Sequence, residues 1–273
     1  MRRNSRELVQ ARELTVNLVR RELKAQHRGT VLGRVWSLAT PLLLVGLYYV
    51  IFTYIVGRPL VEDLDRPDRH HVPFAVYFFA GLVIWNVFGT SAATATGSVV
   101  GSGYLLRKVY FPRAILPLST VLSAMVTFCF EFAVLLVITL VFVGLPSFQL
   151  LWLPLILVVV GVLAYGAALL LSAVTVFLRD VAHFIGVLLQ LWFWGTPIVY
   201  SLSWVADKDS RWLLRILEVN PMTGIVVSFR NVVVLNRPPD FGLLAYDLAV
   251  GVVVLAVGAW VFQRWQRLFA EIV

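Results

Sequence analysis

Few residues of this sequence could carry chemistry, and they lie far apart along the chain. None of the three lysines follows a glycine, so the G-x-x-x-x-G-K-[ST] loop that cradles nucleotide phosphates is missing. The glycine-rich run at 97–103 follows an apolar stretch rather than a strand, and close packing of small residues explains it better. We therefore expect no catalytic residue, no ATPase site and no cofactor in this chain.

Histidines and acids give only weak signals. His70 and His71 stand near two aspartates, but an acidic, solvated loop explains this pattern better than a metal site, so no metal is predicted. Glu131 falls near the middle of an apolar stretch, where an acid costs on the order of several kcal/mol unless it is paired or wet. A functional role and a structural hydrogen bond to a nearby Ser or Thr both fit Glu131. Asp247, nearer the end of its stretch, is expected to be solvated at an interface.

The composition places these residues in a membrane protein. Of the 273 residues, 60% are hydrophobic and only 14% are charged, which is far outside soluble usage. The formal charge of +8 does not indicate nucleic acid, because Lys and Arg flank the apolar stretches, where they anchor a membrane protein against anionic lipid. We expect an all-α integral membrane fold.

Hydropathy divides the chain into an amphipathic interface segment at 1–34 and one membrane domain at 35–273. In the first part, residues 6–27 form an amphipathic helix, which would lie in the membrane interface or dock on a partner subunit. In the second part, residues 204–240 form two short outer helices that break at Pro221. A membrane helix needs about twenty apolar residues. Six stretches meet this length, at 35–57, 74–98, 114–143, 150–177, 184–203 and 243–263.

Lys and Arg in the flanks orient these predicted spans. With the N-terminus inside, fifteen of them lie on the cytoplasmic side and eight on the other. Both termini and the loop at 99–113 are therefore predicted to be cytoplasmic, and residues 204–240 to lie outside.

Aromatic residues gather in the first, second and fifth predicted spans. Lipid-facing packing accounts for them, but a deep aromatic ring is also the surface on which a sugar's C–H face stacks. The candidates for such stacking are Tyr48, Tyr49, Phe52, Tyr77, Trp85, Trp192 and Trp194.

Four stretches in a fixed order resemble one family. They are LGRVW at 32–36, RKVYFPR at 107–113, FLRD at 177–180 with PIVY at 197–200, and EVNPM at 218–222 with Phe229 and Arg230. Together they are similar to the permease subunits of ABC-2 type polysaccharide exporters, which export O-antigen, teichoic acid, capsule and galactan polymers. The missing phosphate loop agrees with this family, whose ATPase is a separate polypeptide.

The resemblance implies a homodimer in a bacterial cytoplasmic membrane, bound to two ATPase subunits that hold ATP and Mg. The two permeases would form a channel for a lipid-linked polysaccharide, and no nucleic acid would take part. Residues 99–113 would hold the coupling helix, with Tyr110 and Phe111 as anchors for a groove on the ATPase. The implied coupling residues are Leu106, Arg107, Lys108, Tyr110, Phe111, Arg113, Arg179 and Asp180. Residues Glu218, Asn220, Pro221 and Arg230 would form the outer gate.

Two other functions fit parts of the pattern. A relative that exports drugs or small lipids would have the same spans without a sugar-stacking channel. A membrane-embedded glycosyltransferase would need clustered acids or a metal, and the inner loops offer chiefly Asp180.

Overall fold

The computed structural model is almost entirely helical. It describes residues 2–26, 36–55, 60–61, 72–108, 111–202, 205 and 211–272. The helices are α1 (Arg2–Gln26), α2 (Trp36–Val50), α3 (Phe74–Ser98), α4 (Gly103–Lys108), α5 (Ile115–Phe142), α6 (Leu153–Phe177), α7 (Val181–Trp194), α9 (Arg211–Val219), α10 (Thr223–Val233), α11 (Phe241–Trp265) and α12 (Phe269–Ile272). A π-helical turn at Ile51–Ile55 continues α2, and 3₁₀ turns at Val100–Ser102 and Phe148–Trp152 precede α4 and α6. The strands β1 (Leu60–Val61) and β2 (Val72–Pro73) form one antiparallel pair, with Leu60 opposite Pro73.

Among these described residues, four helices are long and apolar enough to cross a membrane. They are α3, α5, α11, and α6 together with the 3₁₀ turn before it (Phe148–Phe177). A fifth candidate is the pair α9 and α10, which is broken at Pro221 and bent by 84°. The all-α membrane fold is therefore confirmed, with four to five apolar spans in the described part of the chain.

Two of the six predicted spans are shorter or less regular than expected. At about 1.5 Å per residue, the 14 residues of α7 rise about 21 Å, less than the hydrocarbon core of about 30 Å. The chain turns at Gly195 and Pro197, where the hydropathy pattern predicted a helix to 203. The first predicted span is a regular helix only over α2 and ends in the π-helical turn.

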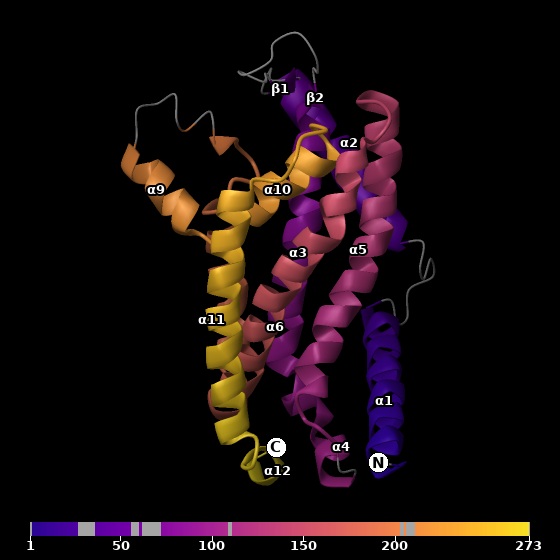
Figure 1. Cartoon of the computed structure of the whole chain (residues 1–273), viewed down its shortest axis with the longest axis vertical. Helices are drawn as coiled ribbons and strands as arrows, with labels where there is room; N and C mark the ends of the chain where they lie inside the picture. Colours follow the sequence, from indigo (N-terminus) through magenta and orange to yellow (C-terminus); the bar gives the residue numbers. More distant parts are fainter. Residues whose placement is uncertain are drawn as a thin grey trace.

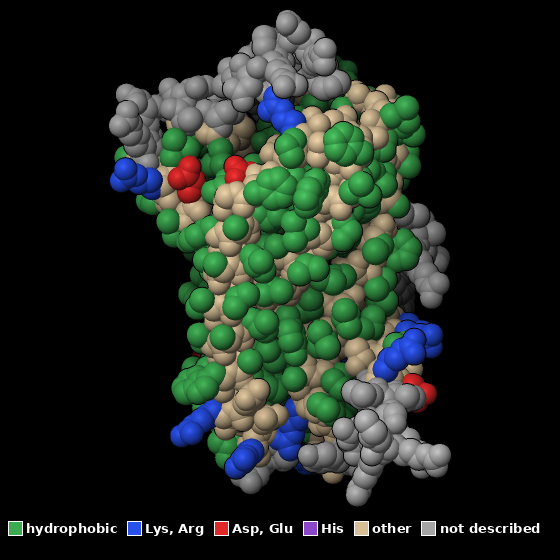
Figure 2. Space-filling model, viewed as in Figure 1, with side chains coloured by type: hydrophobic (Ala, Val, Ile, Leu, Met, Phe, Trp, Pro, Cys, Tyr) green, Lys and Arg blue, Asp and Glu red, His purple; other side chains and the backbone are tan. Residues whose placement is uncertain are grey.

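Figure 1 shows α3, α5, α6 and α11 running side by side along the long axis of the molecule. Both chain ends, α4 and α12 lie at the lower end, which we call the terminal end; α9, α10 and the strands lie toward the upper, or distal, end (Figure 1). Figure 2 shows hydrophobic side chains covering the middle of the visible face, with Lys and Arg at both ends and most of them at the terminal end. The coupling-loop region and both termini thus share one end of an apolar bundle.

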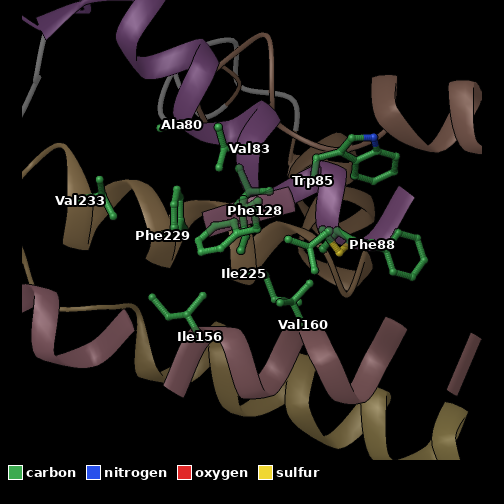
Figure 3. Close-up of a cluster of buried hydrophobic side chains, with 14 of the residues drawn as sticks. Ala80, Val83, Trp85, Phe88, Phe128, Ile156, Val160, Ile225, Phe229 and Val233 are labelled. Atoms are coloured by element: carbon green, nitrogen blue, oxygen red, sulfur yellow. The ribbon is translucent and has the colours of Figure 1, made fainter. Parts of the chain in front are cut away.

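The centre of the bundle is α3. In the most apolar 18-residue stretch of α3, 72% of the residues are buried. The corresponding share is 22% in α5 and in α11, whose exposed surface is apolar and suited to lipid. In Figure 3, Phe128 of α5 and Phe229 of α10 meet in this core, with ring centroids 5.9 Å apart. Ile156 and Val160 contribute from α6 (Figure 3).

Glycines bring α6 and α11 into backbone contact. A Cβ atom on Gly166 would lie 2.7 Å from Cα of Leu255, and one on Gly258 would overlap the carbonyl oxygen of Gly166. Since lipid is as apolar as a side chain, such close packing is what holds membrane helices together.

The N-terminal helix α1 has a buried side and an exposed, charged side. Leu18 is buried against the bundle, whereas Arg12, Arg20 and Lys24 are exposed. Figure 1 shows α1 running beside the terminal half of α5, which α1 contacts. Leu18 and the partly buried Leu14 thus pack on this chain.

Candidate functional site

The described residues of the predicted coupling loop contain the 3₁₀ turn Val100–Ser102, α4 and residues 111–113. Leu106 is buried on the bundle side, Arg107 is exposed, and Phe111 is half-buried. Tyr110 and the side chain of Lys108 lie outside the described residues. The structure therefore gives α4 one side packed on the bundle and another side open at the terminal end.

An apolar cluster, which we call the terminal cluster, lies behind α4 and is separate from the main core. Its buried members come from α1, the segment at 99–106, α5, α6, α11 and α12. They are Leu18, Val99, Leu106, Ile115, Leu116, Leu169, Ala173, Val176, Phe262 and Phe269. Among the charged contacts beside it, Nη1 of Arg113 donates to the backbone carbonyl of Gln266. Arg179 and Asp180, the other predicted coupling residues, are exposed in the connection between α6 and α7.

The deep aromatic residues fall into two groups. Trp85 is 6% exposed, and its ring packs edge to face against Phe193 at 5.9 Å and against Trp192 at 6.5 Å. Tyr49 and Trp194 instead present rings on the surface, at 40% and 56% exposure. The side chains of Tyr48 and Phe52 lie outside the described residues.

Arg230 of α10 is the largest fully buried side chain. Its Nε donates to the carbonyl of Tyr77 at 2.9 Å, and its two terminal nitrogens donate to the carbonyls of Pro197 and Ile198, each at 2.5 Å. The guanidinium also lies 3.8 Å from the centroid of the Tyr77 ring, a cation–π contact. A Cβ on Gly81 would lie 2.9 Å from Cζ of Arg230, so the glycine leaves the space that the guanidinium fills. One side chain thereby joins α10, α3 and the turn after α7.

Asn220 lies between α9 and α10, and both the oxygen and the nitrogen of its side-chain amide form hydrogen bonds. Its Oδ1 accepts from Nε1 of Trp192 at 2.8 Å and from the backbone N–H of Met222 at 3.0 Å. Its Nδ2 donates to the carbonyl of Gly195 at 2.8 Å and to Oγ1 of Thr196 at 2.9 Å. The bend between α9 and α10 is therefore tied to the end of α7.

Two intramembrane acids have different surroundings. Both oxygens of Glu131 accept from Nδ2 of Asn86 on α3, at 3.2 and 3.1 Å, so its hydrogen-bond partner is an amide and not the Ser or Thr of the structural alternative. Asp247 is fully buried rather than solvated, which corrects the sequence expectation. Its oxygens make no hydrogen bond of ordinary geometry but face the backbone N–H groups of Gly224 and Ile225, in the first turn of α10. That position suits an anion.

The structure brings some predicted site residues together and separates others. Asn220 and Arg230 meet the same turn at 195–198, whereas Glu218 is exposed on α9. Sequence reasoning missed Asn86, although a lone amide in an apolar span is itself a signal of an interhelical bond. It also missed α12 and Gly81. His70 and His71 lie outside the described residues.

Comparisons with known proteins agree on one family. A family model described as ABC-2 type transporter matches residues 13–234. The O-antigen export system permease protein RfbA of Myxococcus xanthus is 32% identical over 267 residues, which cover 97% of each chain. A protein of the same name from Klebsiella pneumoniae is 28% identical over 261 residues, 95% of each chain.

Proposed function

Since the chain belongs to the ABC-2 type transporter family, we propose that it is the permease subunit of an ATP-driven exporter of a lipid-linked polysaccharide. The similarity to O-antigen export permeases over 97% of both chains carries this proposal. The membrane-spanning bundle and the missing phosphate loop support it, because such a permease needs a channel and an ATPase on another polypeptide.

Two ATPase subunits would dock at the terminal end, which we place in the cytoplasm. The exposed Arg107, Arg179 and Asp180 offer charges to a partner, and Tyr110 and Phe111 supply aromatic anchors. ATP and Mg would be bound by the partner. Both termini and the interface segment at 1–34 would then be cytoplasmic, in the inner membrane of a bacterium. The membrane domain at 35–273 would have six spans, with α2 and α7 supplying the two short ones.

A channel would form between two copies of this chain. The accessible rings of Tyr49 and Trp194 offer stacking faces for sugars. Tyr77 and Trp85 are buried within the protein, and Trp192 is half-buried and packs against Trp85. Tyr48 and Phe52 would add to the same surface. Stacking without fixed hydrogen bonds suits a repeating polymer, because the polymer has to slide.

The distal end would gate the exit of the polymer. Because α9 and α10 meet at 84° beside Pro221, α9 can swing while α10 stays fixed by Arg230. Asn220 would hold the bend between α9 and α10 against the end of α7, and Glu218 on α9 would face the exit. Glu131 and Asn86 would hold α5 to α3 within the membrane.

The test is ATP hydrolysis by the purified complex. The chain is purified with its ATPase, reconstituted in lipid, and assayed with lipid-linked glycan, a lipid without sugar, or a cationic drug. We expect only the glycan to stimulate hydrolysis. Stimulation by the drug or by the bare lipid alone would favour a small-molecule exporter, and failure to copurify with an ATPase would overturn the proposal.

The coupling role is tested by Tyr110→Ala combined with Phe111→Ala. Loss of both anchors leaves the bundle folded but should uncouple export from ATP turnover. Export per ATP hydrolysed is compared with that of Tyr54→Ala, which changes an exposed tyrosine in the π-helical turn that continues α2. Wild-type export by the double variant would refute the role.

A further inference from the structure

Residues 265–272, which comprise the end of α11 and the short helix α12, pack against the coupling region. Figure 1 shows α12 at the terminal end, below α11, and α12 contacts both α4 and α6. Phe269 is completely buried, and its ring meets that of Phe262 edge to face at 5.2 Å. Both belong to the terminal cluster, which also contains Leu106 of α4.

A charged contact joins the same two segments. Arg113, the last residue of the predicted coupling loop, donates through Nη1 to the backbone carbonyl of Gln266. Gln266 caps the end of α11, where the last carbonyls of a helix lack partners within the helix and carry partial negative charge. A cation at this place is favoured both by the hydrogen bond and by the helix dipole.

A third contact reaches the other inner connection. The ring of Trp265 packs edge to face on Phe177 at 4.9 Å. Phe177 is the last residue of α6 and lies two residues before the exposed Arg179. Residues 265–269 therefore touch both connections that carry predicted coupling residues.

The helix α4 needs such support. It has six residues, far fewer than the 12–15 or so at which an isolated helix becomes even marginally stable in water. Its position therefore depends on packing, and Leu106 is its buried side chain.

We propose that residues 265–269 are a clamp that holds α4 on the bundle, so that movement imposed on α4 reaches α6 and α11. Phe269, Arg113 and Trp265 are its positioning residues. The proposal rests on the proposed function, because it assumes that an ATPase subunit acts on α4. It adds a role for a segment that does not itself need to touch the ATPase.

The first experiment measures whether the clamp exists. Leu106→Cys is introduced with Cys129→Ala, and the full chain with its ATPase is labelled with an impermeant maleimide in inside-out vesicles. Phe269→Ala should raise the labelling rate on the order of tenfold, because emptying this site frees α4 to open locally. Arg113→Gln, which breaks the other contact without emptying the cluster, should raise it less. Ile272→Ala, an exposed residue of the same helix, is the matched control and should leave the rate unchanged.

The second experiment measures coupling in the same variants. Phe269→Ala should still copurify with the ATPase and hydrolyse ATP, but glycan export per ATP should fall roughly fivefold, within the range expected of coupling residues. Phe269→Leu, which refills most of the space, should restore export.

The outcomes separate the two proposals. If the wild-type complex exports glycan but Phe269→Ala matches Ile272→Ala in labelling or in export per ATP, the clamp is overturned and the function stands. If the wild-type chain binds no ATPase, the function is overturned, and the coupling role of the clamp with it.

Discussion

At the distal end, Arg230 makes three hydrogen bonds and Asn220 makes four, and together they join three segments. All but one of their partners lie on other elements. At the terminal end, α4 and α12 are held mainly by apolar side chains, with Arg113 supplying one charged contact. Both ends belong to one bundle, but the forces that hold them differ.

The difference teaches how each end can move. A buried hydrogen bond is made or broken, so the distal end should have discrete closed and open arrangements. Apolar side chains can shift against one another without leaving a polar group unpaired, so the terminal end can adapt to a partner. We therefore expect substitutions in the distal network to cost more stability than polar substitutions at the terminal end.

The largest effect is expected from Arg230→Met. It removes all three hydrogen bonds of the guanidinium and takes from the carbonyls of Pro197 and Ile198, which lie outside a helix, their charged donor, at a cost of roughly 3–5 kcal/mol. A neutral hydrogen bond in a membrane contributes only about 0.6 kcal/mol. A loss as large as that expected here would therefore show that the charge on the donor strengthens these hydrogen bonds. The measurement is the unfolding midpoint in detergent. Arg215→Met, at an exposed arginine on α9, is the control, and equal midpoints would contradict the role of Arg230.

Gly81→Ala should act on the same site through space alone. The added Cβ would displace the guanidinium of Arg230, and overpacking of this kind costs about 2 kcal/mol. Gly97→Ala on the same helix meets open space and should not lower the midpoint. If Gly81→Ala were as stable as Gly97→Ala, the packing around Arg230 would be looser than described.

Asn220→Asp should cost about 1–2 kcal/mol. The acceptor bonds from Trp192 and Met222 can persist, but the two donations to Gly195 and Thr196 are lost. Asn17→Asp, exposed on α1, supplies the matched change of amide to acid. The measurement is the thermal unfolding temperature of both variants. An Asn220→Asp variant as stable as the wild-type chain would exclude that Asn220 holds the bend between α9 and α10.

The smallest effect is expected at the terminal end, from Arg21→Ala. Its hydrogen bond to Oγ of Ser102 is 3.2 Å long and starts from an exposed side chain, so its loss should change stability by no more than about 0.5 kcal/mol. Ser102→Ala, which removes the partner, should behave alike. A loss as large as that of Arg230→Met would erase the contrast between the two ends.

The long spans could be predicted from the sequence because their apolar runs match their helices. The run at 74–98 coincides with α3, and that at 114–143 exceeds α5 by one residue at each end. The run at 184–203 overshoots α7, which ends at Trp194, because apolar residues continue through a turn that Gly195 and Pro197 impose.

The site could be predicted only in part. The family resemblance predicted a role for Arg230 at the outer gate, but its burial depends on carbonyl groups 153 and 33 residues away. The composition of a short segment such as α12 does not predict that Phe269 packs behind α4. Local patterns therefore locate helices, whereas contacts between distant segments decide which charges are buried.

The measurement that tests the central claim most directly is translocation of a lipid-linked glycan into sealed vesicles containing this chain and its ATPase. The glycan is added outside with ATP, and its protection from an added glycosidase is followed over time. Protection that requires ATP, and that is lost in a variant of the ATPase unable to hydrolyse it, is the predicted result. Protection of a small lipid or a drug but not of the glycan would contradict the assignment of a polysaccharide substrate.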